Sequence, residues 1–154
     1  MHEIVRIADR PDLVPTVADW LWHEWWRDDG YTLEQTRDAV AASVSPSGPP
    51  QTFVLLDDGK PVGTASLVAH DLDERPDLTP WLAGVFVVPE ARNQRYAMHL
   101  IRAVEAACRD AGIGTVWLFT ADAERVYARA GWHSVEAIER DGRRPVMLMR
   151  RNLT

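Results

Sequence analysis

The chain has a single cysteine, Cys108, so no disulfide can form within it. It has no run of about 18 apolar residues, so we expect no transmembrane helix. The first residues, M-H-E-I-V-R-I, lack a basic region followed by an apolar stretch, which argues against a signal peptide. Together these absences favour a cytoplasmic protein with no membrane partner.

Basic residues are also scarce. The chain has 17 lysines and arginines against 23 aspartates and glutamates, which gives a net charge of −6. Nucleic acid is therefore not an expected partner, because binding its phosphates needs a dense basic surface. The acidic balance is compatible with a cationic substrate such as an amine, although many proteins carry a similar charge.

Several chemical motifs are missing. The five histidines are scattered, with no H-x-x-x-H pattern and no cysteine pair, so no metal site is indicated. Neither a G-x-S-x-G sequence nor a Walker A sequence is present. We expect Cys108, which lies on the apolar side of a predicted helix, to be a small core residue rather than a nucleophile.

The pattern of apolar residues predicts an α/β chain that folds as one domain over residues 1–154. The expected strands are residues 3–7, 52–56, 62–69, 81–88, 115–120, 135–140 and 146–150. The expected helices are residues 13–25, 33–43 and 98–111, with a short helix that ends at Gly131. Thr32, followed by Gln35, is a capping-box signal for the second helix. Asp58-Gly59 is a hairpin signal between the second and third strands. The third helix is expected to show Glu105 on its polar side. This mixed order predicts a mixed sheet with helices on both faces.

Residues 85–111 are the most informative segment, and they begin V-F-V-V-P-E-A-R-N-Q-R-Y-A-M. An apolar strand stops at Pro89, a short polar loop follows, and a long amphipathic helix begins. In such a unit the unpaired N–H groups at the start of the helix point into the loop. The segment is therefore suited to hold a phosphate or pyrophosphate.

This segment resembles the acetyl-coenzyme A loop of the GCN5-related N-acetyltransferase (GNAT) superfamily, whose usual pattern is V-x-P followed by R/Q-x-x-G-x-G/A. The matching positions hold Arg92, Asn93, Gln94, Tyr96 and Ala97, and Arg95 stands where the family usually has its first glycine. The element order is also similar to that of the superfamily, so the resemblance covers nearly the whole chain. It implies a mostly antiparallel central sheet of about seven strands flanked by about four helices.

The resemblance implies acetyl-coenzyme A as co-substrate and no metal. The loop residues that would surround the coenzyme, mainly through backbone groups, are Arg92, Asn93, Gln94, Arg95, Tyr96, Ala97 and Met98. The pantetheine amides would pair with the strand edge at Val85, Phe86 and Val87. Arg95 can act in two ways. With a right-handed helical backbone its side chain can turn outward to a phosphate, whereas its Cβ would hinder a ligand that must approach the backbone closely.

A second motif, E-R-V-Y-A-R-A-G-W, covers residues 124–132. It is similar to the family's A-x-x-x-Y-x-x-x-G-F/W pattern, and Tyr127 matches the tyrosine that protonates the departing thiolate. A positioned acid of this kind contributes about 10²–10⁴ in rate. The alternative is that Tyr127 is an amphipathic core residue beside Val126 and Ala130.

The general base is not evident from the sequence. Many family members have a glutamate on the strand before this helix, and the matching residue here is Phe119, which cannot accept a proton. The remaining candidates are His70, Asp71, Asp73 and Glu74, each of which is also a plausible solvated loop residue. A water molecule or an acceptor that arrives partly neutral could replace a protein base.

Four tryptophans lie within residues 20–26. Trp22 and Trp25 fall on the apolar stripe of the first helix and are expected in the core, whereas Trp26 projects away from it. Trp26 could line an acceptor pocket or pack under a loop. The acidic loop with Asp71, together with Trp81, could form the opposite wall of that pocket, and its carboxylates suit a cationic amine.

The resemblance as a whole implies an N-acetyltransferase that transfers an acetyl group to the primary amine of a small molecule or peptide. The amine would attack the thioester directly in a ternary complex. A catalytically degenerate module that keeps the fold and acts by binding remains the alternative, and so does transfer of a longer acyl group. The last strands could form a homodimer, as members of the family often do.

Overall fold

The structure, a computed structural model, describes residues 1–154. Its strands are β1 (His2–Arg6), β2 (Gln51–Asp57), β3 (Lys60–Val68), β4 (Trp81–Val87), β5 (Thr115–Thr120), β6 (His133–Arg140) and β7 (Arg143–Asn152). Its α-helices are α1 (Val14–Leu21), α2 (Leu33–Ala41), α3 (Tyr96–Asp110) and α4 (Glu124–Arg129). A π-helical turn, Trp22–Trp26, continues α1.

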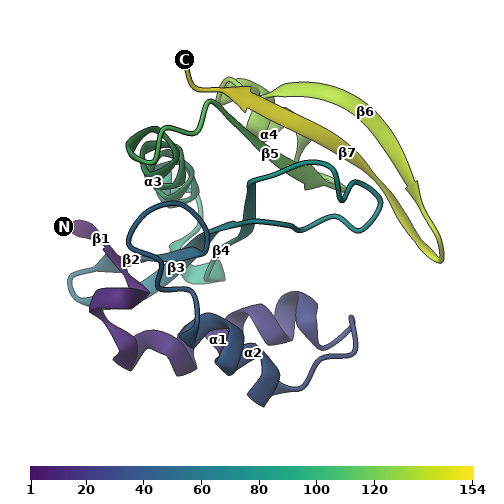
Figure 1. Ribbon diagram of the computed structural model, residues 1–154. Coiled ribbons are helices and arrows are strands. Elements are labelled where there is room, and N and C mark those ends of the chain that lie inside the picture. Colours follow the sequence, from purple (N-terminus) through teal and green to yellow (C-terminus); the bar gives the residue numbers. More distant parts are fainter.

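The seven strands form one sheet in the order β1-β2-β3-β4-β5-β7-β6. Every neighbouring pair is antiparallel except β4 and β5, which are parallel. The predicted mostly antiparallel sheet of about seven strands with four helices is therefore confirmed. Figure 1 shows that β5, β7 and β6 diverge from β1–β4 and that the long β6–β7 hairpin curves away from the rest of the sheet.

The two faces of β2 explain how helices cover the sheet. Side chains alternate along a strand, so Phe53 and Leu55 point to one face, and Val54 and Leu56 point to the other. Phe53 and Leu55 belong to the main core cluster with residues of α3, whereas Val54 and Leu56 pack with residues of α1 and α2. The helices α1 and α2 therefore cover one face and α3 covers the other (Figure 1).

Local sequence signals account for the ends of two helices. At the start of α2, the Thr32 side chain accepts from the Gln35 N–H and the Gln35 side chain accepts from the Thr32 N–H, which confirms the predicted capping box. The helix α3 begins at Tyr96, two residues earlier than expected, after Arg95 in a left-handed conformation.

Cys108 is fully buried, and burial raises the pKa of its thiol to about 11, as fits a core residue. None of the helices combines the length and the apolarity that are needed to cross a membrane.

Candidate active site

The free edge of β4 is the first element of the site. The parallel pairing of β4 with β5 is limited to Trp81 and Trp117, and the strands separate beyond that pair. The Val88 N–H donates to the Val62 carbonyl at 2.9 Å, so the pair Gly63 and Val87 is not hydrogen-bonded. The N–H and C=O of Val87 therefore point away from β3, toward the gap between β4 and β5.

The path of β4 toward that gap is irregular. The register between β3 and β4 shifts between Thr64 and Ser66, which places a bulge at residues 84–85 of β4. Gly84 has φ +63°, a conformation that favours glycine, and a Cβ there would lie 3.3 Å from Leu21 of α1. The bulge and α1 are therefore in close contact at the middle of β4.

The loop before α3 presents unpaired N–H groups next to this edge. The backbone N–H groups of residues 93–98 donate to no acceptor in the protein. The Arg92 Nε donates to the Val87 carbonyl at 3.0 Å, which ties the loop to the end of β4 and leaves the Val87 N–H as the free donor. An unpaired helix start of this kind is suited to an anionic ligand.

Asn93 and Arg95 have positive φ angles of 68° and 62°. From the sequence, an Arg95 side chain that turns outward to a phosphate was expected with a right-handed helical backbone. The Arg95 backbone is left-handed instead. The loop thus takes the conformation that a glycine would favour, but with an arginine in that position. The Arg95 side chain is exposed and makes no hydrogen bond or ion pair.

The other residues expected to bind the coenzyme differ in how exposed their side chains are. Gln94 is exposed, Ala97 and Met98 are half-buried against the main core cluster, and the Tyr96 side chain is buried in it. Burial also raises the pKa of Tyr96. A ligand at the loop can therefore reach the backbone N–H of Tyr96 but not its ring. On β4, the partly buried Val85 and Phe86 pack against the same cluster.

Tyr127 lies on α4, where its half-buried ring meets Trp132 at 6.2 Å between centroids and at 66°. Its hydroxyl makes no hydrogen bond with the protein, and burial raises its pKa to about 12. The group therefore stays protonated at neutral pH, as a proton donor must be. The ring also packs against the core cluster that contains Val87.

A buried ion network connects α4 to α3. Glu105 is fully buried. Its carboxylate accepts from Arg102 Nη1 at 2.8 Å and from the Trp132 indole N–H at 3.2 Å. Arg151 Nε lies 3.0 Å from Glu105 Oε1, although this N–H is not aligned for a hydrogen bond. Arg102 and Arg151 both donate to the Ala130 carbonyl, at 3.0 and 2.9 Å.

This network holds the end of α4 three residues after Tyr127. It also explains the glycine of the A-G-W motif, since a Cβ on Gly131 would lie 1.7 Å from Arg151 Nη1, and Gly131 has φ +97°. The expectation that Glu105 lies on the exposed side of α3 is wrong. Its spacing from Ile101 and Cys108 places Glu105 on the apolar stripe of α3. The expectation had followed its charge rather than this spacing.

Phe119 on β5 contacts Trp81 edge to face, and the Arg140 guanidinium lies 5.3 Å from its centroid. Arg140 also pairs with Glu74, with 3.2 Å between Nε and Oε1. Glu74 is thus already engaged, which makes it a weaker candidate for a proton acceptor.

Asp71 has the most perturbed carboxyl group of the acidic loop. Its pKa is raised to about 7, mainly because of desolvation; Arg140 lowers the pKa, and the charges of Asp73 and Asp29 raise it. The residue nevertheless keeps an exposed surface. A carboxyl group that protein surrounds closely but solvent still reaches can accept a proton near neutral pH.

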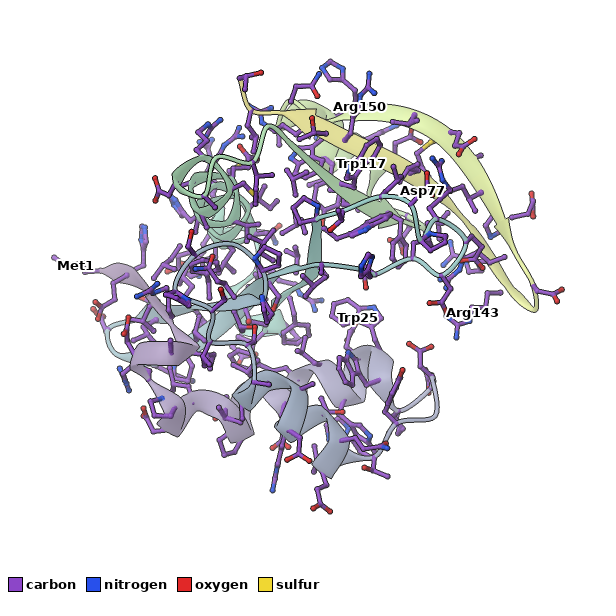
Figure 2. All side chains as sticks on the ribbon, in the orientation of Figure 1. Met1, Trp25, Asp77, Trp117, Arg143 and Arg150 are labelled. Atoms are coloured by element: carbon purple, nitrogen blue, oxygen red, sulfur yellow. The ribbon has the colours of Figure 1, made fainter.

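The tryptophans of the first helix are arranged differently from the expectation. Trp25 is 39% exposed, whereas Trp26 is half-buried against the cluster of α1 and α2 and meets Tyr31 at 5.0 Å. The π-helical turn Trp22–Trp26 is the reason, because it winds less per residue than an α-helix and shifts the stripe by one position. Figure 2 shows Trp25 rising from these helices toward the strands.

Trp81 offers no surface to an acceptor. It is fully buried, its indole N–H donates to the Leu78 carbonyl at 2.7 Å, and it packs with Leu72 and Leu148. It supports the acidic loop from inside, so the expectation that it forms a pocket wall is not met. Across from that loop, Arg143 near the tip of the β6–β7 hairpin pairs with Asp29 at 3.0 Å (Figure 2).

A sheet that opens between two parallel strands beside an unpaired helix start is the arrangement of an acetyltransferase. The model of the acetyltransferase (GNAT) family matches residues 14–132, and the chain therefore belongs to that family. Among curated proteins, none matches the sequence significantly.

Solved structures share the fold at low sequence identity. An aminoglycoside 6'-N-acetyltransferase complexed with coenzyme A has a TM-score of 0.78 at 14% identity, covering 99% of this chain and 97% of that chain. The yncA protein of Salmonella typhimurium, solved with acetyl-CoA, has 0.76 at 15%, covering 99% and 94%. A GNAT-family acetyltransferase from Streptococcus pneumoniae has 0.75 at 16%, covering all of both chains.

Proposed function

We propose that residues 1–154 form a single N-acetyltransferase domain that transfers an acetyl group from acetyl-coenzyme A to a primary amine of a small cationic molecule. The observation that carries the proposal is the separation of β4 from β5 beyond Trp81, which leaves the Val87 N–H free beside an unpaired helix start. Family membership and the position of Tyr127 in the second motif support it.

The residues of the loop and of β4 fit the coenzyme chemically. The free N–H groups of residues 93–98 match a pyrophosphate, and the exposed side chains of Arg92 and Arg95 add positive charge next to them. The open edge at Val85, Phe86 and Val87 matches the amides of the pantetheine arm. When bound, the coenzyme supplies the acetyl group as a thioester.

Two side chains move protons in the proposed reaction. As the amine nitrogen bonds to the acetyl carbon and the carbon–sulfur bond breaks, Asp71 takes the proton lost by the amine, directly or through one water. Tyr127 gives its hydroxyl proton to the departing sulfur. The two groups then return to their starting states by exchange with solvent, so protons balance over the cycle.

The acceptor side is acidic and aromatic. The charges of Asp73 and Asp29 act on Asp71 and help to raise its pKa, and Trp25 presents an exposed ring. Carboxylates and an aromatic face both favour an ammonium group. The similar aminoglycoside acetyltransferases support a small polyamine-like acceptor, although a peptide amine remains an alternative.

A direct test incubates the protein with acetyl-coenzyme A and four kinds of amine: aminoglycosides, polyamines, amino acids and peptides. Thiol release and the added mass of one acetyl group would be followed. We expect turnover with multiply charged small amines. Tight coenzyme binding without turnover on any amine would favour a non-catalytic binding module instead, an alternative to which Phe119 in the usual glutamate position lends support.

Arg95→Gly is expected to separate stability from coenzyme affinity. Glycine relieves the left-handed strain, so the free energy of unfolding should rise by about 1 kcal/mol. Loss of the unpaired guanidinium should weaken acetyl-coenzyme A binding about tenfold, measured by calorimetry. Arg95→Lys serves as control, since it keeps the charge and the strain. Tighter binding by the glycine variant would show instead that the arginine obstructs the coenzyme.

Asp71→Asn tests the proposed base. The value of kcat/KM for the unaltered protein should rise with pH through about 7, where the Asp71 carboxyl loses its proton. The variant should lose about 10²–10⁴ in rate together with that limb of the profile. Asp73→Asn is the matched control, with the limb retained. If kcat/KM of Asp71→Asn still rose with pH through about 7, the rise would come from another group, such as the acceptor amine.

Asp71→Asn is expected to lower the reaction rate but to raise stability. Because the folded protein raises this pKa from 3.8 to about 7, the folded state holds the proton more tightly than the unfolded state between those values. The contribution of Asp71 to stability therefore falls as pH rises through this window. Asp71→Asn should thus be more stable than the unaltered protein at pH 8, as measured by urea denaturation.

A further inference from the structure

The helix α4, which carries Tyr127, has few contacts of its own to fix its position. It has six residues, none of them buried, and its N-cap residue Ala123 makes no side-chain capping bond. A helix this short is not stable by itself, so its place in the fold is set by capping and by packing against other elements. The position of the Tyr127 hydroxyl therefore depends on the groups that hold the end of α4.

The C-terminal end of α4 closes with a Schellman motif that joins Tyr127 to Trp132. The Trp132 N–H donates to the Tyr127 carbonyl at 3.0 Å. The Gly131 N–H, from a residue with φ +97°, donates to the Ala128 carbonyl at 3.1 Å. In this motif the side chains at the first pair of positions often pack together, and the rings of Tyr127 and Trp132 meet edge to face. Trp132 thus contacts Tyr127 through both main chain and ring.

Trp132 is in turn fixed by a carboxylate of another helix. Its side chain is buried, and its indole N–H donates to Glu105 Oε2 at 3.2 Å. Two guanidinium groups hold that carboxylate, since Arg102 Nη1 lies 2.8 Å and Arg151 Nε lies 3.0 Å from Glu105 Oε1. Both arginines also donate to the carbonyl of Ala130, the C-cap residue of α4. Side chains of α3 and β7 therefore hold the end of α4 at two points.

The Glu105 carboxylate sets the orientation of its partners. An apolar side chain could fill this position without a buried charge, and replacing a whole buried ion network by apolar residues is often neutral or stabilising. Carboxylate oxygens, by contrast, accept hydrogen bonds only within a narrow range of distances and angles. The indole of Trp132, and the ring that packs against it, are therefore held in one orientation.

We propose that Glu105 is a positioning residue for the acetyl transfer. Through Trp132 it fixes the Tyr127 hydroxyl where the departing sulfur can take its proton. Glu105 is fully buried and contacts neither coenzyme nor amine, but a displacement of about 1 Å at a reacting group can lower a rate about 10²-fold. The catalytic consequence rests on the proposed function, whereas the connection from Glu105 to Tyr127 is a property of the fold.

Glu105→Gln tests the catalytic consequence. The single amide oxygen can accept from the indole or from the arginines but not from both, because the amide NH₂ group is a donor. We expect the single-turnover rate of acetyl transfer to fall about tenfold or more, while the dissociation constant of acetyl-coenzyme A stays within about threefold. Cys108→Ala, at a buried position one turn further along α3, is the matched control and should change neither.

A double variant separates positioning from a general loss of stability. If Glu105 acts through the Tyr127 hydroxyl, adding Glu105→Gln to Tyr127→Phe should reduce the single-turnover rate no further. Losses that multiply in the double variant would overturn the proposal. If Glu105→Gln does not bind acetyl-coenzyme A and is unfolded, Trp132→Phe takes its place, because it removes the indole N–H and keeps an aromatic ring. The same loss, and the same absence of a further loss with Tyr127→Phe, are then expected.

Nuclear magnetic resonance of the three tyrosines, labelled with ¹³C in the ring, tests the connection without any turnover. The Tyr127 signal is identified by its loss in Tyr127→Phe. In Glu105→Gln it should shift and broaden as the Trp132 ring loses its fixed orientation, while the signals of Tyr31 and Tyr96 stay in place. An unaltered Tyr127 signal overturns the proposal.

Failure of the proposed function gives a different result. If the unaltered protein acetylates none of the amines, the proposed function fails and the catalytic role of Glu105 fails with it, even where the Tyr127 signal moves. If the unaltered protein turns over and Glu105→Gln reacts at the same rate, only the role of Glu105 is overturned.

Discussion

Replacing Glu105 with alanine should lower the free energy of unfolding by about 3–5 kcal/mol, the usual cost of removing one member of a buried ion pair. Arg102 is partly exposed and can turn to solvent, but Arg151 is only 22% exposed, and Trp132 is buried. The substitution would leave a guanidinium and an indole N–H without their acceptor, which is why the loss should be large. Urea denaturation of the coenzyme-free protein measures it.

Glu34→Ala, at an exposed position on α2, is the matched control and should change stability by about 0.5 kcal/mol or less. Glu105→Gln should fall between the two, because the amide oxygen can still accept from Trp132. A loss below about 1 kcal/mol for Glu105→Ala would mean that the network contributes little to holding α4 against α3.

Tyr127→Phe should lower kcat by about 10²–10⁴ while the dissociation constant of acetyl-coenzyme A stays within a few-fold. The substitution removes one hydroxyl that makes no hydrogen bond within the protein and leaves the ring in contact with Trp132. The fold should therefore be unaffected, and the loss should arise in the proton transfer to sulfur. Single-turnover measurement, where chemistry limits the rate, is the appropriate readout.

Tyr31→Phe is the control, since Tyr31 is an exposed tyrosine whose ring packs on Trp26. It should leave kcat unaltered. If Tyr127→Phe turned over normally in the single-turnover experiment, Tyr127 would be a packing residue of α4, and the proton would reach the sulfur from water.

Much of this architecture could be predicted because local signals agree with the tertiary fold. The Thr32 and Gln35 capping box, the hairpin at Asp58 and the stripe of α3 each act over a few residues, and each is present in the structure. The resemblance of residues 85–111 and 124–132 to family motifs supplied the mostly antiparallel sheet of about seven strands, which no local signal specifies.

Other features depend on contacts that a single sequence does not reveal. The π-helical turn exchanged the environments of Trp25 and Trp26, and an assumed 100° per residue could not anticipate it. Glu105 was placed outside because a buried carboxylate is rare, and its partner Arg151 lies 46 positions away, at the end of the chain. The pKa of Asp71 arises from residues on three separate segments.

The main-chain character of the proposed coenzyme edge has an evolutionary consequence. The donors at Val87 and residues 93–98 are peptide groups, which every residue other than proline supplies. Substitutions in these segments can thus alter side chains while leaving the recognition chemistry in place, as the arginine in a glycine-type conformation at position 95 illustrates. The sequence around a site made of main-chain groups can therefore change widely, and chains that are only 14–16% identical to this one share its fold.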